Sequence, residues 1–341
     1  MRSPRPVDDP EKIASATHLA VFQHGLLGSK RDFGRFVETF RSQFHVDGLY
    51  LHSGESNDNS FFQTYDGVDQ GGERLADEIL QLAEKMPNLR KLSMIGHSLG
   101  GLYNRYCIGV LLARGFFDKI EPVIRWPVEV TSAYTGKPAD TNLCVIRIPE
   151  EDIQRDWRWL VALSNASFGM HCLTSAGNGK TQQPQNSTAP TLLSCMTRGQ
   201  FMQALQMFKV RTLYANMFFD MQVPYSCAAI RAFNPYRQSM KDSLMSPIYT
   251  HIVFDSLKNA QPFVDGDVIL DQLPYAFTSD AEQDELRGML LSVQSVGWRR
   301  IDVLFGSVMA HEHIIAKRAK LDKPLDSGID IVHHVMDTFL L

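Results

Sequence analysis

The amino-acid sequence predicts an α/β fold, in which a mostly parallel, doubly wound sheet carries helices on both faces. Two observations lead to this prediction. Over residues 17–115, apolar runs as short as a buried strand alternate with longer segments whose apolar residues recur at helical spacing. The 341-residue chain is also 44% hydrophobic and 21% charged, as is usual for a protein with a large buried core. Strands and helices that alternate in this way form a parallel sheet.

The first third of the chain supplies three strands, each followed by a helix. The first strand, THLAVFQHG, ends in glycine, and the segment after it places Phe33, Phe36, Val37 and Phe40 on one helical face. The second helix ends at Pro87. Strands are expected at 17–25, 45–53 and 91–96, and helices within 26–44, 71–87 and 99–115.

The remainder of the chain has a weaker pattern. Residues 116–158 contain several prolines and predict an irregular insertion or lid, and residues 174–198 predict an irregular polar loop. Residues 231–297 receive no assignment, because prolines interrupt any long element. A helix is expected at 200–208, strands at 209–217 and 298–306, and a closing helix at 328–341. Since no linker or repeat divides the chain, we expect a single domain over 1–341 with a polar tail over 1–16.

Charge and composition argue against several classes of function. The net charge of −4 and the pI near 6.3 disfavour a nucleic-acid partner. The five cysteines form no Cys-x-x-Cys pair, which disfavours a disulfide framework. The polar N-terminal segment argues against a signal peptide, and no stretch reaches the about 18 to 20 apolar residues of a membrane span. We therefore expect a cytoplasmic protein, for which a membrane or lipid-droplet surface is an optional peripheral contact.

The stretch SMIGHSLGGLYNRY, residues 93–106, contains a G-x-S-x-G motif around Ser98. One interpretation is a glycine-rich bend in which Ser98 caps a helix. The other is a nucleophile elbow, in which Gly96 and Gly100 allow a strand and a helix to cross closely. An apolar strand precedes the motif and a helical pattern follows it, so the context favours a nucleophile. His97 then supports the elbow, and the N–H of Leu99 is expected to bind an oxyanion.

The segment QHGLLGS, residues 23–29, is the candidate for the second half of an oxyanion hole. It follows the first predicted strand, and Gly25 and Gly28 give the backbone freedom to turn inward. We assign the N–H of Leu26 as the donor. His24 is expected to brace this loop rather than to transfer protons.

An acid and a base are expected after later strands, in the order Ser, Asp, His. Asp220 follows the strand predicted at 209–217 and is the preferred acid, with Asp255 and Asp267 as reserves. His311, in a loop after the strand predicted at 298–306, is the preferred base, and His313 is the alternative.

The same stretch, His311-Glu312-His313, has a rival interpretation as a metal site. Two histidines two residues apart suit a strand-borne site, and Glu312 or the pair His333–His334 would add ligands. No further ligands converge on this stretch by spacing, so we expect neither a metal nor a cofactor.

Five blocks of this sequence, in the same order, are similar to those of the putative serine esterase family of lipase-like α/β-hydrolases. This family is catalogued as a domain of unknown function, and it includes phospholipase-like members. The blocks are VFQHGLLGSKRDF, TYDGVDQGGERLADEI, SMIGHSLGGLYNRYCIGVL, FKVRTLYANMFFDMQVPYSCAAI and AHEHIIAKR. One segment departs from the family, because LSNASFG (163–169) stands where the family commonly has A-T-P-H-x-G. The departure bears on substrate preference rather than on the triad.

The resemblance implies an α/β-hydrolase fold with Ser98, Asp220 and His311 as a catalytic triad. It also implies a carboxylic ester hydrolase of the lipase or phospholipase kind, with an acyl-ester or lipid substrate. Two alternatives stay open. One is a hydrolase-fold protein that binds an acyl ligand or a partner without turnover, and the other is a thioesterase or peptidase that uses the same triad.

Overall fold

The computed structural model describes the chain in segments separated by gaps. Of 127–130 and 280–283 it describes only the backbone. The described residues are 10–43, 47–58, 64, 66–118, 120, 127–130, 191–208, 210–232, 234–237, 245–257, 280–317 and 328–339.

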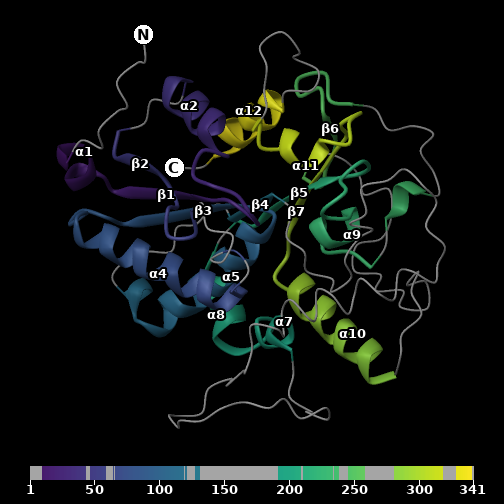
Figure 1. Cartoon of the computed structure of the whole chain (residues 1–341), viewed down its shortest axis with the longest axis horizontal. Coiled ribbons are helices and arrows are strands. Elements are labelled where there is room, and N and C mark those ends of the chain that lie inside the picture. The colour runs from purple at the N-terminus through teal and green to yellow at the C-terminus, as the bar shows by residue number, and fades with distance from the viewer. Residues whose placement is uncertain are drawn as a thin grey trace.

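A seven-stranded sheet, in the order β2–β1–β3–β4–β5–β7–β6, runs through the middle of the molecule (Figure 1). Six of the strands are parallel, and β6 runs antiparallel to β7 at one edge. The carboxyl ends of the parallel strands therefore meet at one edge of the sheet, where α/β proteins place their sites. The strands are β1 (His18–Gln23), β2 (Leu49–Ser53), β3 (Lys91–His97), β4 (Pro127–Val130), β5 (Thr212–Asn216), β6 (Ile252–Asp255) and β7 (Arg299–Val303).

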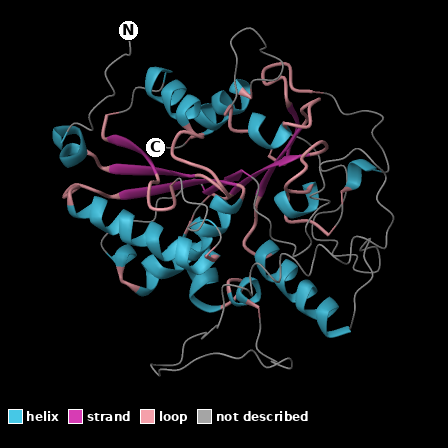
Figure 2. Ribbon diagram, in the orientation of Figure 1, coloured by secondary structure: helices cyan, strands magenta, loops and turns pink. Residues whose placement is uncertain are grey.

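Helices cover both faces of this sheet (Figure 2). One face carries α4 (Val68–Glu84), α5 (Leu99–Ala113), α8 (Gly199–Met207) and α10 (Asp280–Gln294), and the other carries α2 (Gly34–Gln43) and α12 (Ile329–Thr338). Shorter helices are α1 (Pro10–Ser15), η1 (Phe116–Asp118), α7 (Leu192–Cys195), α9 (Tyr225–Ala228), η3 (Pro235–Arg237) and α11 (Ala310–His313).

The strand β1 shows why the sequence has continuous apolar runs. Leu19 and Val21 belong to the core under α4 and α5, whereas Ala20 and Phe22 belong to the core under α2 and α12. Successive side chains of a strand point to opposite faces, so a strand covered on both faces is apolar at every position. The expected α/β class and the doubly wound parallel sheet are thus confirmed.

The structure corrects the predictions for the chain beyond residue 115. Residues 116–158 were expected to be irregular, yet Pro127–Val130 forms β4 at the centre of the sheet. Proline is tolerated there because it is the first residue of the strand. The range 174–198 contains α7, and the unassigned range 231–297 contains β6 and α10. Residues 119, 121–126, 131–158 and 174–190, the segment LSNASFG, Asp267 and the first nine residues of the tail lie outside the described residues.

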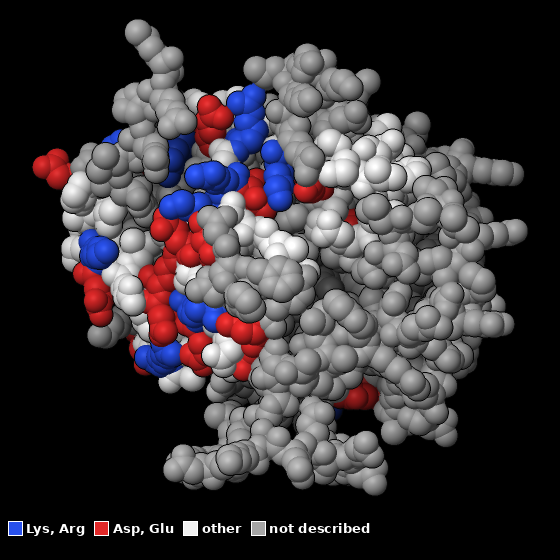
Figure 3. Space-filling model, in the orientation of Figure 1, with Lys and Arg blue, Asp and Glu red and all other residues white. Residues whose placement is uncertain are grey.

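Charged side chains of both signs are interspersed on the face shown in Figure 3. Arg114, the residue that follows α5, forms ion pairs with Glu73 and Asp77 of α4, and Arg74 pairs with Asp66. Among the helices that the structure describes, none is both long enough and apolar enough to span a bilayer.

Candidate active site

Ser98 is the single residue between the end of β3 and the start of α5. Its backbone has φ 57° and ψ −128°, a conformation that non-glycine residues rarely adopt, and the residue is 8% exposed. Backbone strain of this kind gathers at functional sites, where the surrounding structure holds it in place. The strand, bend and helix are the context that a nucleophile elbow requires.

The close crossing of the elbow with the neighbouring strand requires glycine. A Cβ on Gly100 would overlap the carbonyl oxygens of Gln23 and His24, which end β1 and begin the next loop. Gly96 similarly lies against the backbone of Gly101. Both glycines therefore permit the close crossing of strand and helix that the motif predicts.

The loop after β1 lies directly against the elbow. A Cβ on Gly25 would lie 2.7 Å from the Cβ of Ser98 and 3.1 Å from the backbone nitrogen of Leu99. Within the described part of the chain, neither the Leu26 N–H nor the Leu99 N–H has a hydrogen-bond acceptor. Leu99 is the first residue of α5, where the helix dipole favours negative charge. This pair of N–H groups is suited to an oxyanion.

Asp220 and His311, which the sequence suggests as acid and base, lie in contact. The Nδ1 atom of His311 is 3.1 Å from the carboxylate oxygens of Asp220. Asp220 follows β5, and His311 lies in the one-turn helix α11 after β7 rather than in the open loop that was expected. The Asp220 carboxylate also accepts hydrogen bonds from the backbone N–H groups of Gln222 (3.0 Å) and Val223 (2.8 Å).

Opposing effects set the pKa of the Asp220 carboxyl. Burial alone raises this pKa. The charge of His311 and its hydrogen bond lower the pKa, as do hydrogen bonds from Val223 and Asn216, and together they outweigh burial. The net pKa lies below the usual value, so the carboxylate is ionised at neutral pH. An ionised Asp220 holds the proton of His311 on Nδ1, which leaves Nε2 free to accept a proton.

His97 connects the elbow to the base. Its Nε2–H donates a hydrogen bond of 2.7 Å to the backbone oxygen of His311, and the two rings lie 4.5 Å apart. Burial, and then the charge of His311, hold the pKa of His97 well below its ordinary value, so its ring is neutral. The residue next to Ser98 therefore fixes the main chain of the candidate base.

The alternative site residues have other partners. His313 is buried with its ring 5.8 Å from that of Phe305. Asp255 is held by Arg299 of the neighbouring strand, with contacts of 2.6 and 3.0 Å. Among the described side chains, no group of three or more His, Cys, Asp and Glu is arranged to hold a metal ion.

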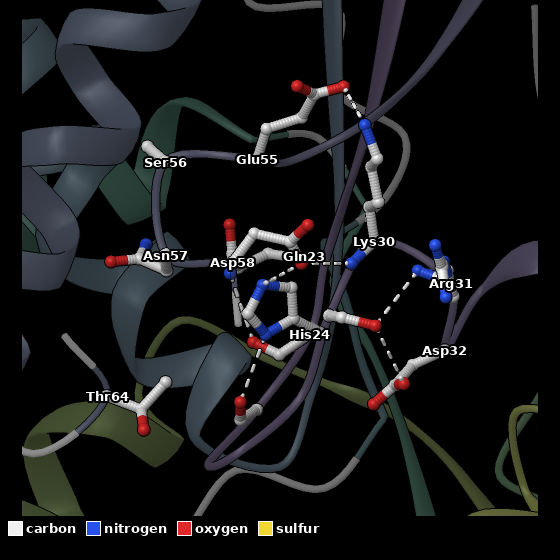
Figure 4. Close-up of polar contacts among 12 residues, drawn as sticks. Gln23, His24, Lys30, Arg31, Asp32, Glu55, Ser56, Asn57, Asp58 and Thr64 are labelled. Carbon is white, nitrogen blue, oxygen red and sulfur yellow. Dashed lines mark hydrogen bonds and ion pairs between the residues drawn. The ribbon is translucent and has the colours of Figure 1, made fainter. Parts of the chain in front are cut away.

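Sequence reasoning missed two supporting residues. Asn216 at the end of β5 donates a hydrogen bond of 2.8 Å to Asp220. Asp58, in the chain after β2, lies 3.6 Å from Nε2 of His24, whose ring is buried inside the loop after β1 (Figure 4). The four-residue spacing of Asn216 and Asp220 is visible in the sequence, but it gives no sign that the side chains turn toward each other. No sequence pattern pairs Asp58 with His24.

Comparisons with known proteins agree with the resemblance that the sequence motifs indicate. Residues 14–127 match the model of a family described as "Putative serine esterase (DUF676)", a range that includes the elbow and the loop after β1. The "Putative lipase C4A8.10" of Schizosaccharomyces pombe is 26% identical over 235 residues, which are 63% of this chain and 26% of that protein. The "Putative lipase ROG1" of Saccharomyces cerevisiae is 28% identical over 173 residues, 49% of this chain and 22% of that protein. The chain thus spans about a quarter of the length of these relatives.

Two solved structures are similar at lower identity. The RedJ thioesterase from the prodiginine pathway of Streptomyces coelicolor has a TM-score of 0.33 and 16% identity, over 67% of this chain and 76% of that one. Phospholipase PlaB from Legionella pneumophila has a TM-score of 0.34 and 15% identity, over 61% of this chain and 40% of that one. The family match and the two putative lipases agree with the expected resemblance to serine esterases, and the parallel sheet with helices on both faces is the architecture that was expected.

Proposed function

We propose that this protein is a serine hydrolase that cleaves carboxylic esters through an acyl-enzyme on Ser98. The observation that carries the proposal is the contact of His311 Nδ1 with the ionised Asp220, beside an elbow whose backbone is strained at Ser98. A serine hydroxyl becomes a useful nucleophile only when a base removes its proton and the oxyanion is held.

The proposed reaction has two halves. The Ser98 oxygen attacks the acyl carbonyl carbon while His311 Nε2 takes the hydroxyl proton, and the N–H groups of Leu26 and Leu99 hold the oxyanion. The bond to the alcohol then breaks, and His311 returns the proton to the departing oxygen. In the second half, water loses a proton to His311 and attacks the acyl carbon, which releases the acid and restores the Ser98 hydroxyl. Asp220 stabilises the imidazolium in both halves.

A fluorophosphonate probe tests this proposal, because it labels only a serine that a base activates. We expect labelling of the folded protein at Ser98, located by peptide mass spectrometry, and none in Ser98→Ala. Ester hydrolysis should be lost in the same variant. An unlabelled, folded wild-type protein would refute the proposal and favour the non-catalytic acyl-binding alternative.

We further propose that the ester is a lipid, met at a lipid surface. Both relatives from yeasts are named putative lipases. Leu27 (57% exposed) and Phe219 (51% exposed) present apolar side chains beside Leu26 and Asp220. Both have positive φ, 53° and 63°, which costs about 1 kcal/mol or more each. An apolar side chain held in strain next to reacting groups is suited to contact an acyl chain.

Acyl chain length is the measurement that tests this finer proposal. We expect kcat/KM to rise from acetyl to decanoyl p-nitrophenyl esters, and this preference to weaken in Leu27→Ser and Phe219→Ser. Leu257→Ser is the matched control. Leu257 is 73% exposed, but it follows β6, which runs antiparallel, so it lies at the amino ends of the parallel strands and away from the proposed site. A flat profile in the wild type, or an equal change in the control, would remove the lipid assignment and leave the esterase.

A further inference from the structure

The loop after β1 encloses one fully buried histidine that the proposed reaction does not use. His24 has no exposed surface, and Figure 4 shows its ring at the centre of the loop, beside Asp58. Its Nδ1 atom lies 3.1 Å from the backbone oxygen of Gly25. Because a carbonyl oxygen only accepts, the ring must carry a proton on Nδ1 and donate it.

The oxygen of Gly25 accepts a second hydrogen bond, from the backbone N–H of Gly28 at 3.1 Å. Two donors therefore hold one carbonyl group. The peptide bond from Gly25 to Leu26 is trans, so its N–H points opposite to its C=O. Fixing the direction of the Gly25 oxygen consequently fixes the direction of the Leu26 N–H, the group assigned to the oxyanion.

Other contacts hold the backbone of this loop, rather than the His24 ring, against Asp58 and Thr64 of the chain after β2. Asp58 Oδ1 lies 3.6 Å from Nε2 of His24 and accepts the backbone N–H of Lys30 at 2.6 Å. The backbone N–H of Leu27 donates to Thr64 Oγ1 at 3.3 Å. The loop is thus tied down on the side away from the elbow, and its other side faces Ser98.

We propose that His24 is a positioning residue for the oxyanion hole, and that its Nδ1–H orients the Gly25–Leu26 peptide so that the Leu26 N–H faces the reacting oxygen. This inference rests on the proposed esterase function. Loss of one oxyanion donor typically lowers kcat by about 10²- to 10³-fold. Because the oxyanion exists only in the transition state, misorienting the donor should reduce kcat and leave KM nearly unchanged.

Two amide substitutions separate this role from simple filling of space. Asparagine places its side-chain nitrogen where histidine has Nδ1, whereas glutamine places it near Nε2. We expect His24→Asn to retain kcat within about tenfold, and His24→Gln and His24→Leu to lose about 100-fold, with KM changed less than threefold. The rate of fluorophosphonate labelling should follow the same order, because the phosphonyl oxygen occupies the same hole.

The matched control is His334→Gln, because His334 is an equally buried histidine on α12, bonded to Tyr214. This control should lose stability in thermal melts and keep kcat. Should His24→Leu fail to fold, the comparison of His24→Asn with His24→Gln decides the question, and Asp58→Asn serves as a second variant with an expected several-fold fall in kcat.

The outcomes separate the two proposals. An inert wild-type protein would refute the esterase function and this inference together. An active wild type with His24→Gln as fast as His24→Asn, or with a rise in KM at constant kcat, would refute the role of His24 alone. Rescue by asparagine, with kcat as the affected parameter, would establish it.

Discussion

Replacing Asp220 by asparagine changes one atom of the site and tests the proposed triad directly. Both carboxylate oxygens lie 3.1 Å from Nδ1 of His311. Oδ1 also accepts the N–H groups of Gln222 and Val223, whereas Oδ2 accepts one hydrogen bond from Asn216 Nδ2 besides that from His311. The amide of the variant will keep its oxygen toward the two backbone donors. Its NH₂ group then faces His311 Nδ1, and the imidazole must move its proton to Nε2 to accept from it.

An imidazole protonated on Nε2 cannot take the proton of Ser98, and it has lost the carboxylate that stabilises its charged form. Enzymes with a serine triad lose about 10⁴-fold in kcat on this substitution, which corresponds to about 5.5 kcal/mol at 1.36 kcal/mol per factor of ten. We expect the same size of effect on kcat for a p-nitrophenyl ester, measured at pH 8 with the folded fraction checked by circular dichroism.

The matched control is Asp255→Asn, since Asp255 is also a buried aspartate but is paired with Arg299 at the edge of the sheet. The control should lower the unfolding free energy and keep kcat. If Asp220→Asn keeps kcat within tenfold, the reasoning about the tautomer is wrong. If Asp255→Asn instead abolishes activity, the acid has been misassigned.

Three further predictions concern the base, the loop after β1 and the pH dependence of stability. His311→Ala should lose at least about 10³-fold in kcat and His313→Ala only a few-fold; the reverse result in steady-state assays would exchange their roles. Gly25→Ala should sharply reduce kcat, because the new Cβ would lie 2.7 Å from the Cβ of Ser98. The control Gly34→Ala, whose new Cβ would have no atom within 4 Å, should keep kcat and gain up to about 1 kcal/mol of stability. Equal kcat values for the two variants would contradict the argument that Gly25 is needed for close packing. Burial, and then the charge of Lys91, lower the pKa of His18 from 6.5 to about 4. The contribution of neutral His18 to the free energy of unfolding is therefore present above pH 6.5 and is lost as the pH falls toward 4. Relative to His18→Gln, urea unfolding should show about 3 kcal/mol lost over this range, and parallel pH profiles of the two proteins would exclude this contribution.

The first third of the chain could be predicted because its periodic signals are strong. Helix α4 buries Leu75, Ile79 and Leu82 on one face, and β1 and β3 are buried along nearly their whole length. Strand β4 escaped prediction because it is four residues long and begins with proline, so it has no periodicity to detect. Helix α10 was missed although Leu286, Met289, Leu290 and Val293 are buried at helical spacing, because prolines nearby obscured it.

The candidate site was likewise predictable only where local sequence patterns mark its residues. The elbow at Ser98 is a local pattern, and the order of acid and base along the chain pointed to Asp220 and His311. The hydrogen bond from His97 to the main chain of His311 joins residues 214 positions apart, and the contact of Asp58 with His24 crosses between two loops. Such contacts depend on how strands are ordered in the sheet, and no local pattern contains that order.

The order of strands has a consequence for when the protein becomes active. β7 follows β6 in the chain but lies between β5 and β6, so it enters a position with a neighbour on each side. His311, the proposed base, comes after β7, so a growing chain on the ribosome contains Ser98 long before His311 is synthesised. Without that base the serine is a weak nucleophile. Under the proposed mechanism, the nascent protein would therefore not cleave esters before β7 has been inserted beside β5.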